Sequence, residues 1–222
     1  MTTYKELFGK AVKFLSTDPT TEAEGQVWYN STSGTFKSVV AGAAWSSGSL
    51  LITARNDLGG VGTQTAALGF GGNLNPGSSS ATEEYNGSGW SNGGNLGTAR
   101  YGLGGAGTQT AGLGFGGTPP ITNATEEYDG SAWTGGGNMA TARAGIRGCG
   151  TQTAGLGFGG TIGPPVATNA TEEYNGSAWT AGGNLNMARR LVGSAGTQTA
   201  GLAFGGALPP ASNATEEYNG TS

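Results

Sequence analysis

The residues best suited to chemistry are four pairs of adjacent glutamates. The pairs are Glu83-Glu84, Glu126-Glu127, Glu172-Glu173 and Glu216-Glu217. Two carboxylates can serve as the acid and base of a glycosidase if both reach the same glycosidic bond. Neighbouring residues of a strand point to opposite faces, however, so the two members of a pair cannot converge on one substrate atom. Their fourfold repetition favours a structural role, and we expect no enzymatic activity.

Other catalytic and metal-binding residue types are scarce. The chain has no histidine and a single cysteine, Cys149. It therefore offers no Ser-His-Asp or Cys-His arrangement and no Cys/His zinc site. We expect no catalytic residue, no bound metal and no cofactor.

Composition and charge exclude further classes. Of 222 residues, 46 are glycine, and the net charge is −4. Lysine and arginine form no cluster, so nucleic acid is not an expected partner. The first residues, MTTYKELFGKAVKFLS, lack the pattern of a signal peptide, and no apolar run is long enough to span a membrane. We expect no secretion signal and no membrane insertion.

The elements that position the glutamates belong to a repeat. Trp45, Trp90, Trp133 and Trp179 are 45, 43 and 46 residues apart, and the same spacings separate Phe70, Phe115, Phe158 and Phe204. Arg55, Arg100, Arg143 and Arg189 follow the same spacings, and Tyr85, Tyr128, Tyr174 and Tyr218 close each unit. The sequence thus contains four copies of a unit of 43–46 residues.

Each unit contains signals for four short strands. TQTAGLGFGG alternates apolar and small polar residues, ATEEY follows, and a strand begins at each tryptophan. The fourth strand is predicted at TAR and the residues after it. Asn-Gly after the tyrosine predicts a two-residue hairpin turn, which would place Tyr85 opposite Ser88 and Glu83 opposite Trp90. The repeated aromatic residues are expected to fill the space between successive sheets, and glycine permits their close approach.

These residues resemble the kelch motif. Gly71-Gly72, Glu83, Tyr85, Trp90 and Arg100 supply it once, and the other units repeat it. The resemblance implies an all-β fold, a kelch-like β-propeller of four-stranded blades over residues 43–222. It also implies structural ion pairs between two sets of residues: Arg55, Arg100, Arg143 and Arg189 with Glu83, Glu126, Glu172 and Glu216.

The four units suggest a four-bladed ring. The sequence pattern starts at the strand of Trp45 and stops after Tyr218, so the N-terminal strand is expected to complete the last blade. Two alternatives remain at this stage: the chain is truncated, or it pairs with another copy.

Residues 1–42 lack the repeat. GKAVKFL is predicted to be a strand, and QVWYN with TFKSVV a hairpin. The combination of DPT, EGQVWYNST and TFK resembles the N-terminal region of virion proteins of marine tailed bacteriophages. The resemblance implies an anchoring segment that docks on other virion proteins. The alternative is a plain hairpin packed against the propeller.

The loops after each Gly-Gly pair vary in sequence and in length, with 8, 6, 9 and 7 residues. Loops on a rigid scaffold are where binding usually occurs, and proline stiffens them. The candidate binding residues are Asn75, Pro76, Pro119, Pro120, Pro164, Pro165, Pro209 and Pro210.

The expected function is that of a non-enzymatic phage structural protein. It would be a multi-copy tail or capsid fibre, or a decoration protein, located in the virion. Its propeller would be displayed for adhesion to a host surface protein or glycan. The alternative is a kelch-type protein-interaction module without a virion role.

Overall fold

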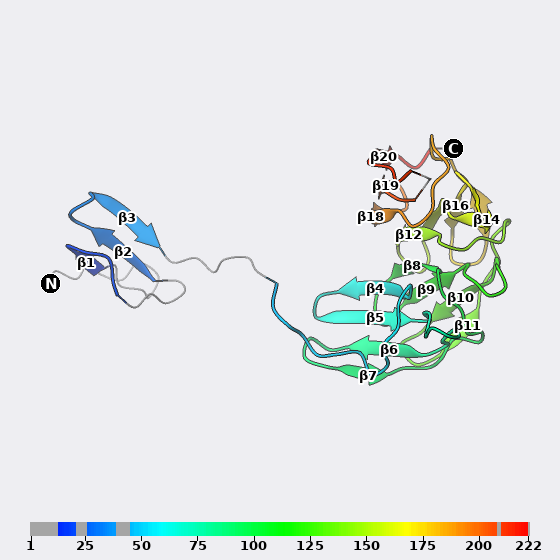
Figure 1. Ribbon diagram of the computed structural model, residues 1–222, viewed down its shortest axis with the longest axis horizontal. Coiled ribbons are helices and arrows are strands. Elements are labelled where there is room, and N and C mark those ends of the chain that lie inside the picture. Colours follow the sequence, from blue (N-terminus) through cyan, green and yellow to red (C-terminus); the bar gives the residue numbers. More distant parts are fainter. Residues whose placement is uncertain (1–12, 21–25, 39–44, 208–209, 222) are drawn as a thin grey trace. The chain divides into compact units, whose positions relative to one another are not determined.

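The computed structural model describes residues 13–20, 26–38, 45–207 and 210–221. Within these ranges all regular secondary-structure elements are β-strands, so the expected all-β class is confirmed (Figure 1). The chain divides into two units, Met1–Ser47 and Gly48–Ser222. The boundary predicted after residue 42 lies outside the described residues.

The first unit contains a three-stranded sheet in the order β1 (Lys13–Leu15), β2 (Val27–Asn30) and β3 (Thr35–Ser38). β2 and β3 form the predicted antiparallel hairpin, and β1 runs parallel to β2. The turn is stabilised by the side chain of Asn30, whose Oδ1 accepts hydrogen bonds from the amides of Thr32 and Ser33 at 3.0 Å each.

Asp18 ties this small sheet together. Its carboxylate forms an ion pair with Lys37 at 2.6 Å and accepts hydrogen bonds from Asn30 Nδ2 at 2.7 Å and Trp28 Nε1 at 3.0 Å. Donors favour the charged form of a carboxylate. Lys37, then Asn30 and Trp28, therefore lower the pKa of Asp18 to about 2.

The second unit contains four main sheets, which we call sheets I to IV in chain order. Sheet I comprises β4 (Gly59–Thr63), β5 (Ala66–Phe70), β6 (Thr82–Tyr85) and β7 (Trp90–Asn92). Sheet II comprises β8 (Gly104–Gly107), β9 (Gly112–Phe115), β10 (Thr125–Tyr128) and β11 (Trp133–Gly135). Sheet III comprises β12 (Arg147–Gly150), β13 (Gly155–Phe158), β16 (Thr171–Tyr174) and β17 (Trp179–Ala181). Sheet IV comprises β18 (Gly193–Thr197), β19 (Ala200–Phe204) and β20 (Thr215–Tyr218), and a small hairpin of β14 (Thr161–Gly163) and β15 (Val166–Ala167) adjoins sheet III in sequence.

The hairpin register differs from the sequence-based prediction. Tyr85 lies opposite Trp90, and Glu83 lies opposite Asn92. The connection has four residues because Asn86 starts the turn instead of occupying its centre: its amide donates to Gly89 O at 3.1 Å, while its Oδ1 accepts from Gly89 N at 2.9 Å. A side chain that caps the turn in this way replaces the backbone geometry of a two-residue Asn-Gly turn.

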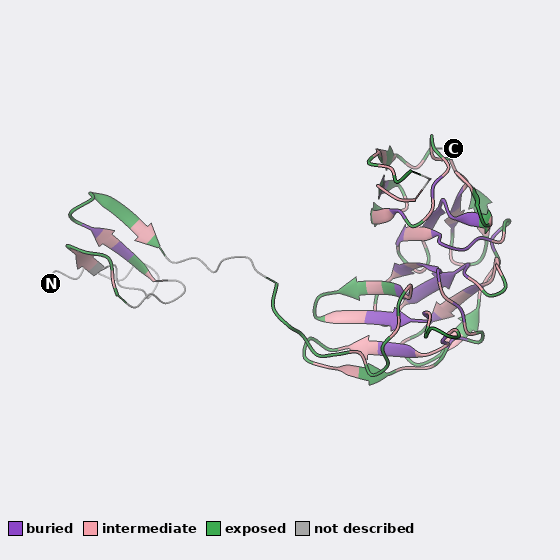
Figure 2. Ribbon diagram, in the orientation of Figure 1, coloured by how far each residue is buried: buried purple, intermediate pink, exposed green. Residues whose placement is uncertain are grey.

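Successive sheets pack face to face along an arc (Figure 1). Their first strands are neighbours, with β4 beside β8, β8 beside β12, and β12 beside β18. Buried residues gather between the sheets (Figure 2), and each buried cluster combines side chains of two adjacent sheets. Glycine permits this approach: a Cβ at Gly157 of sheet III would lie 2.9 Å from Cε2 of Phe115 in sheet II.

The predicted closed ring is not found in the described residues. Sheet IV has three strands, and β20 pairs with β19 alone. The Trp45 side chain, expected to complete this sheet, is fully exposed at 104%. Similar contacts recur at the three interfaces between successive sheets. Because each interface turns the next sheet by a limited angle, the four sheets leave the arc open between sheets I and IV (Figure 1).

Candidate functional site

The first glutamate of each pair binds an arginine inside its own sheet. The Nη2 to Oε1 distances are 3.1 Å for Arg55–Glu83, 2.8 Å for Arg100–Glu126, 2.8 Å for Arg143–Glu172 and 2.6 Å for Arg189–Glu216. All four arginine side chains are at most 1% exposed. These carboxylates are therefore neutralised and hydrogen-bonded where they lie.

Arg100, Arg143 and Arg189 also bind both ends of the variable loop of their own sheets. Nη1 of Arg143 donates to Gly159 O at 2.9 Å and to Ala170 O at 2.7 Å. Gly159 follows β13 and Ala170 precedes β16, so one guanidinium holds both ends of the variable loop. Burial lowers the pKa of Arg143, and the charge of Glu172 opposes that shift. The other carboxylate oxygen of Glu172 is also used, since Oε2 accepts from Ala140 N at 2.7 Å.

The second glutamate of the first three pairs accepts a hydrogen bond from the next sheet. Glu84 accepts from the hydroxyl of Tyr128, and Glu127 accepts from Tyr174 in the same way. Glu173 likewise accepts from Tyr218. Burial, reinforced by the glutamate, raises the pKa of Tyr128 and of Tyr174 to about 12. In the first three pairs both carboxylates are thus engaged in structural contacts, on opposite faces of the strand.

The tryptophans also bridge successive sheets. The ring of Trp133 in sheet II lies 4.9 Å from that of Phe70 in sheet I, and its Nε1 donates to Thr82 Oγ1 at 2.8 Å. Trp179 in sheet III repeats these contacts with Phe115 at 4.8 Å and Thr125 at 2.9 Å.

The expected core residues are buried unequally. Phe70, Phe115, Tyr128 and Tyr174 are 0% exposed and Phe158 is 3% exposed. Trp90, Trp133, Trp179, Tyr85 and Tyr218 are partly buried. Phe204 and Trp45 depart from the expectation, with 44% and 104% exposure. The exposed residues are those for which the described chain provides no covering sheet.

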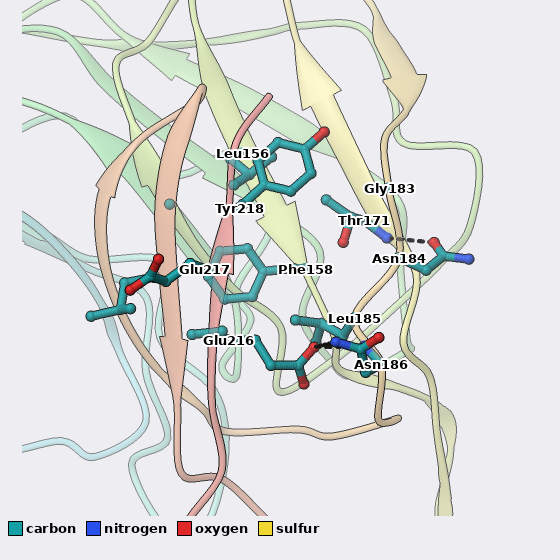
Figure 3. Close-up of a pocket in the computed structure, with 13 residues that line it drawn as sticks. Leu156, Phe158, Thr171, Gly183, Asn184, Leu185, Asn186, Glu216, Glu217 and Tyr218 are labelled. Atoms are coloured by element: carbon teal, nitrogen blue, oxygen red, sulfur yellow. Dashed lines mark hydrogen bonds between the residues drawn. The ribbon is translucent and has the colours of Figure 1, made fainter. Parts of the chain in front are cut away.

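A hollow of about 70 Å³ lies between sheets III and IV, at the position that corresponds to those of Trp133 and Trp179 at the two other interfaces (Figure 3). Phe158 and Thr171 line it, and they correspond to the Phe and Thr partners of Trp133 and Trp179. Figure 3 shows Tyr218 beside Phe158 and Leu156 on the same wall. No tryptophan contacts Phe158 or Thr171 in the described part of the chain. We call this hollow the indole socket.

A backbone ladder runs through the inner end of the arc. Gly102 N donates to Asp57 O at 2.9 Å, Gly145 N to Gly102 O at 2.7 Å, and Leu191 N to Gly145 O at 2.8 Å. Each of these residues has a positive φ, between 51° and 64°. Asp57 and Leu191 adopt this conformation although side chains disfavour it, which indicates that the ladder holds them there.

A second hollow, of about 270 Å³, opens beside this ladder. Its polar lining includes Asp57, Tyr101 and Arg190, and its loop residues include Ile121 and Pro164. Arg147 Nη2 lies 3.3 Å from Asp57 Oδ1, which neutralises that carboxylate. Arg190 has no ion-pair partner in the described ranges. We call this hollow the loop-face hollow.

The candidate loop residues surround it only in part. Pro164 lines the hollow, whereas Asn75, Pro76, Pro119, Pro120, Pro165 and Pro210 are exposed elsewhere on their loops. Pro209 lies outside the described residues. Asp57, Tyr101 and Arg190 are not among the residues predicted from the sequence. Their sequence signal was weak because the corresponding positions of the other repeats hold different residue types.

The residues that the structure describes offer neither a metal site nor a membrane-spanning helix. No three His, Cys, Asp or Glu side chains gather there as metal ligands. The same ranges hold no helix with the length and hydropathy needed to cross a membrane. No protein-family model matches the chain, and no curated protein is significantly similar to it.

Proposed function

We propose that the second unit is a kelch-like β-propeller scaffold that binds a target at the loop-face hollow. The observation that carries the proposal is the convergence of residues from all four repeats on this one hollow: Asp57, Tyr101, Ile121, Pro164 and Arg190. Asp57 belongs to the backbone ladder, while the amides of Tyr101 and Arg190 donate to Thr118 O at 2.8 Å and Ala207 O at 3.2 Å, so this part of the hollow is preorganised. Preorganisation lowers the entropy that binding must overcome.

Binding is favoured over catalysis because the glutamates are already engaged. Each first glutamate is paired with a buried arginine, and Glu84, Glu127 and Glu173 accept tyrosine hydroxyls. Seven of the eight paired glutamates are therefore held by side chains of the protein itself. The lining of the loop-face hollow, with its arginine, phenol and threonine groups, suits a host-surface glycan or an acidic protein loop.

We further propose that the protein is a phage virion component, with the first unit as its anchor to other virion proteins. The short motifs of residues 18–37 support this assignment, and the structure gives them a distinct folded unit. Asp18, within the DPT motif, contacts Trp28 and Asn30 of EGQVWYNST and Lys37 of TFK. The motif residues therefore form one structural element.

Binding at the loop-face hollow can be tested with two substitutions. Arg190→Ala and Tyr101→Ala should each reduce binding of the labelled chain to host cells and to a glycan array about tenfold, with unchanged unfolding midpoints. Asn92→Ala, on the exposed outer strand of sheet I, is the control and should bind normally. Equal binding by all three variants and the wild type would contradict the assignment.

The virion role has a separate test. Mass spectrometry of purified phage particles should detect the chain, and deletion of residues 1–47 should release it from the particles. Absence from the particles, together with capture of a soluble cellular partner through the hollow, would favour the kelch-type interaction module.

A further inference from the structure

The two ends of the arc leave complementary groups without partners. We call the unpacked face of sheet I the leading face and that of sheet IV the trailing face. The leading face holds an apolar hollow of about 390 Å³, lined in part by Gly60, Val61, Leu68, Gly69 and Trp90. The trailing face carries Phe204, which is 44% exposed, whereas the corresponding Phe70 and Phe115 are fully buried.

Glutamine contacts define how one sheet binds the next. Gln109 Nε2 of sheet II donates to Ala67 O at 3.1 Å and to Tyr85 O at 2.6 Å in sheet I. Gln152 and Gln198 make the matching pairs of bonds to the preceding sheet, at 2.7–3.0 Å. Gln64, the corresponding residue of sheet I, is exposed. Its matching acceptors, Gly201 O and Tyr218 O, belong to sheet IV.

The side-chain pairs follow the same rule. Every tyrosine from Tyr128 onward donates to a glutamate of the preceding sheet, which leaves Tyr85 without a glutamate and Glu217 without a tyrosine among the described residues. Trp90 lacks the threonine acceptor that Trp133 and Trp179 have, and Thr215 is exposed where Thr82 and Thr125 are buried. The unpartnered donors of the leading face, Gln64, Tyr85 and Trp90, therefore match the unpartnered acceptors of the trailing face.

The segment Trp45–Ser47 matches the missing outer strand of sheet IV. Trp45 precedes Arg55 by ten residues, as Trp90, Trp133 and Trp179 precede their arginines. Gly48 follows Trp45–Ser47 and lies beside the Tyr85 hydroxyl, as Gly93 lies beside that of Tyr128. Gly48 therefore occupies the place beside sheet I that follows the outer strand of a preceding sheet, and the indole of Trp45 is fully exposed.

We propose that copies of this chain associate head to tail. The leading face of one copy packs on the trailing face of another, and Trp45–Ser47 of the first pairs with β20 of the second. Its indole enters the indole socket against Phe158 and Thr171. A second copy is the occupant because the open arc keeps sheets I and IV of one chain apart (Figure 1). A heterologous interface of this kind generates a ring or a filament.

Cysteine pairs distinguish this arrangement from closure within one chain. The registers of β6–β7, β10–β11 and β16–β17 place Ser46 opposite Glu217, and directly opposed strand residues lie at disulfide distance. In a Cys149→Ala background, a mixture of Ser46→Cys and Glu217→Cys chains should yield a disulfide-linked heterodimer that neither variant forms alone. No link in the mixture, with an intrachain link in the Ser46→Cys/Glu217→Cys double variant, would overturn the proposal.

A matched pair of glutamine variants provides a second test, which requires no ligand. Gln64→Ala should weaken association about tenfold in sedimentation velocity, because two hydrogen bonds are lost, and should leave the unfolding midpoint of the dilute chain unchanged. Gln152→Ala should instead lower that midpoint, since its two bonds lie within the chain. Unchanged association of Gln64→Ala would contradict the proposed interface.

Discussion

Sheets III and IV contain the same repeated residue types, yet they differ sharply in burial. Phe158 of sheet III is 3% exposed because sheet IV covers it, whereas Phe204 of sheet IV is 44% exposed. The same holds for the threonine at the start of each third strand, since Thr171 is buried and Thr215 is exposed. These phenylalanine and threonine side chains therefore gain their burial from the next sheet, whereas the ion-paired Arg189 is 0% exposed within sheet IV itself.

This difference implies nearest-neighbour energetics. Each sheet offers a phenylalanine ring, a glutamate and two carbonyl acceptors, and the tryptophan, tyrosine and glutamine of the next sheet bind to them. Stability should then rise from the ends of the arc to its middle, as in other repeat proteins.

The largest effect is expected for the buried ion pairs. Arg143→Ala leaves the buried carboxylate of Glu172 and the carbonyls of Gly159 and Ala170 without their donor. Breaking a buried pair in this way should reduce the free energy of unfolding by about 3–5 kcal/mol, measured by urea denaturation. Arg147→Ala, which removes a partly exposed pair, should cost less than about 1 kcal/mol. Equal losses for both variants would contradict the structural role of Arg143.

A comparison of two phenylalanines measures the gradient directly. Phe115→Ala should cost about 3–4 kcal/mol, because the ring is fully buried against Trp179 and the glycines of sheet III. Phe204→Ala should cost less than half as much in dilute solution, since much of that ring already faces solvent. A Phe204 loss as large as that of Phe115 would show that the trailing face is covered.

The tyrosine–glutamate contacts predict a loss of stability at alkaline pH. Because the pKa of Tyr128 and Tyr174 rises from 10 to about 12 on folding, the unfolded state releases these protons first. Their contribution is complete below pH 10 and declines as pH rises from 10 to about 12. The Tyr128→Phe/Tyr174→Phe variant should be less sensitive to pH in this range, as measured by denaturation at several pH values. An unchanged pH profile would contradict the assignment.

The smallest effect is expected at Cys149. The matching positions in sheets II and IV are Ala106 and Ala195, so Cys149→Ala should change the free energy of unfolding by less than about 1 kcal/mol. Burial raises the pKa of this thiol to about 11. Alkylation should therefore be slow at neutral pH and become rapid on unfolding, and rapid alkylation of the folded chain would contradict the burial.

Much of this architecture can be predicted from spacing. The arginines and the first glutamates recur with the same spacings as the tryptophans. If the four units form four similar sheets, this spacing is sufficient to pair each arginine with a glutamate. The inter-sheet glutamines were missed, although Gln64, Gln109, Gln152 and Gln198 recur with the same spacings of 45, 43 and 46 residues. These glutamines bind backbone carbonyls of the preceding sheet. Every residue has a backbone carbonyl, so the sequence does not indicate which ones act as acceptors.

Two other features depend on three-dimensional detail. The hairpin register was wrong because the Asn86 side chain caps a four-residue loop, while the Asn-Gly pair alone favours a two-residue turn. Asp57 and Arg147 meet across the inner end of the arc although 90 residues separate them. Such a contact follows from the angle between successive sheets, which the sequence pattern does not determine.

Amide hydrogen exchange, followed by mass spectrometry in dilute solution, tests the central claim most directly. If each sheet is stabilised by its neighbours, the amides of β9 and β13 should exchange slowest, and those of β20 should exchange fastest among the strands of the second unit. Raising the protein concentration should then protect β20. Uniform protection of all four sheets in dilute solution would contradict the account.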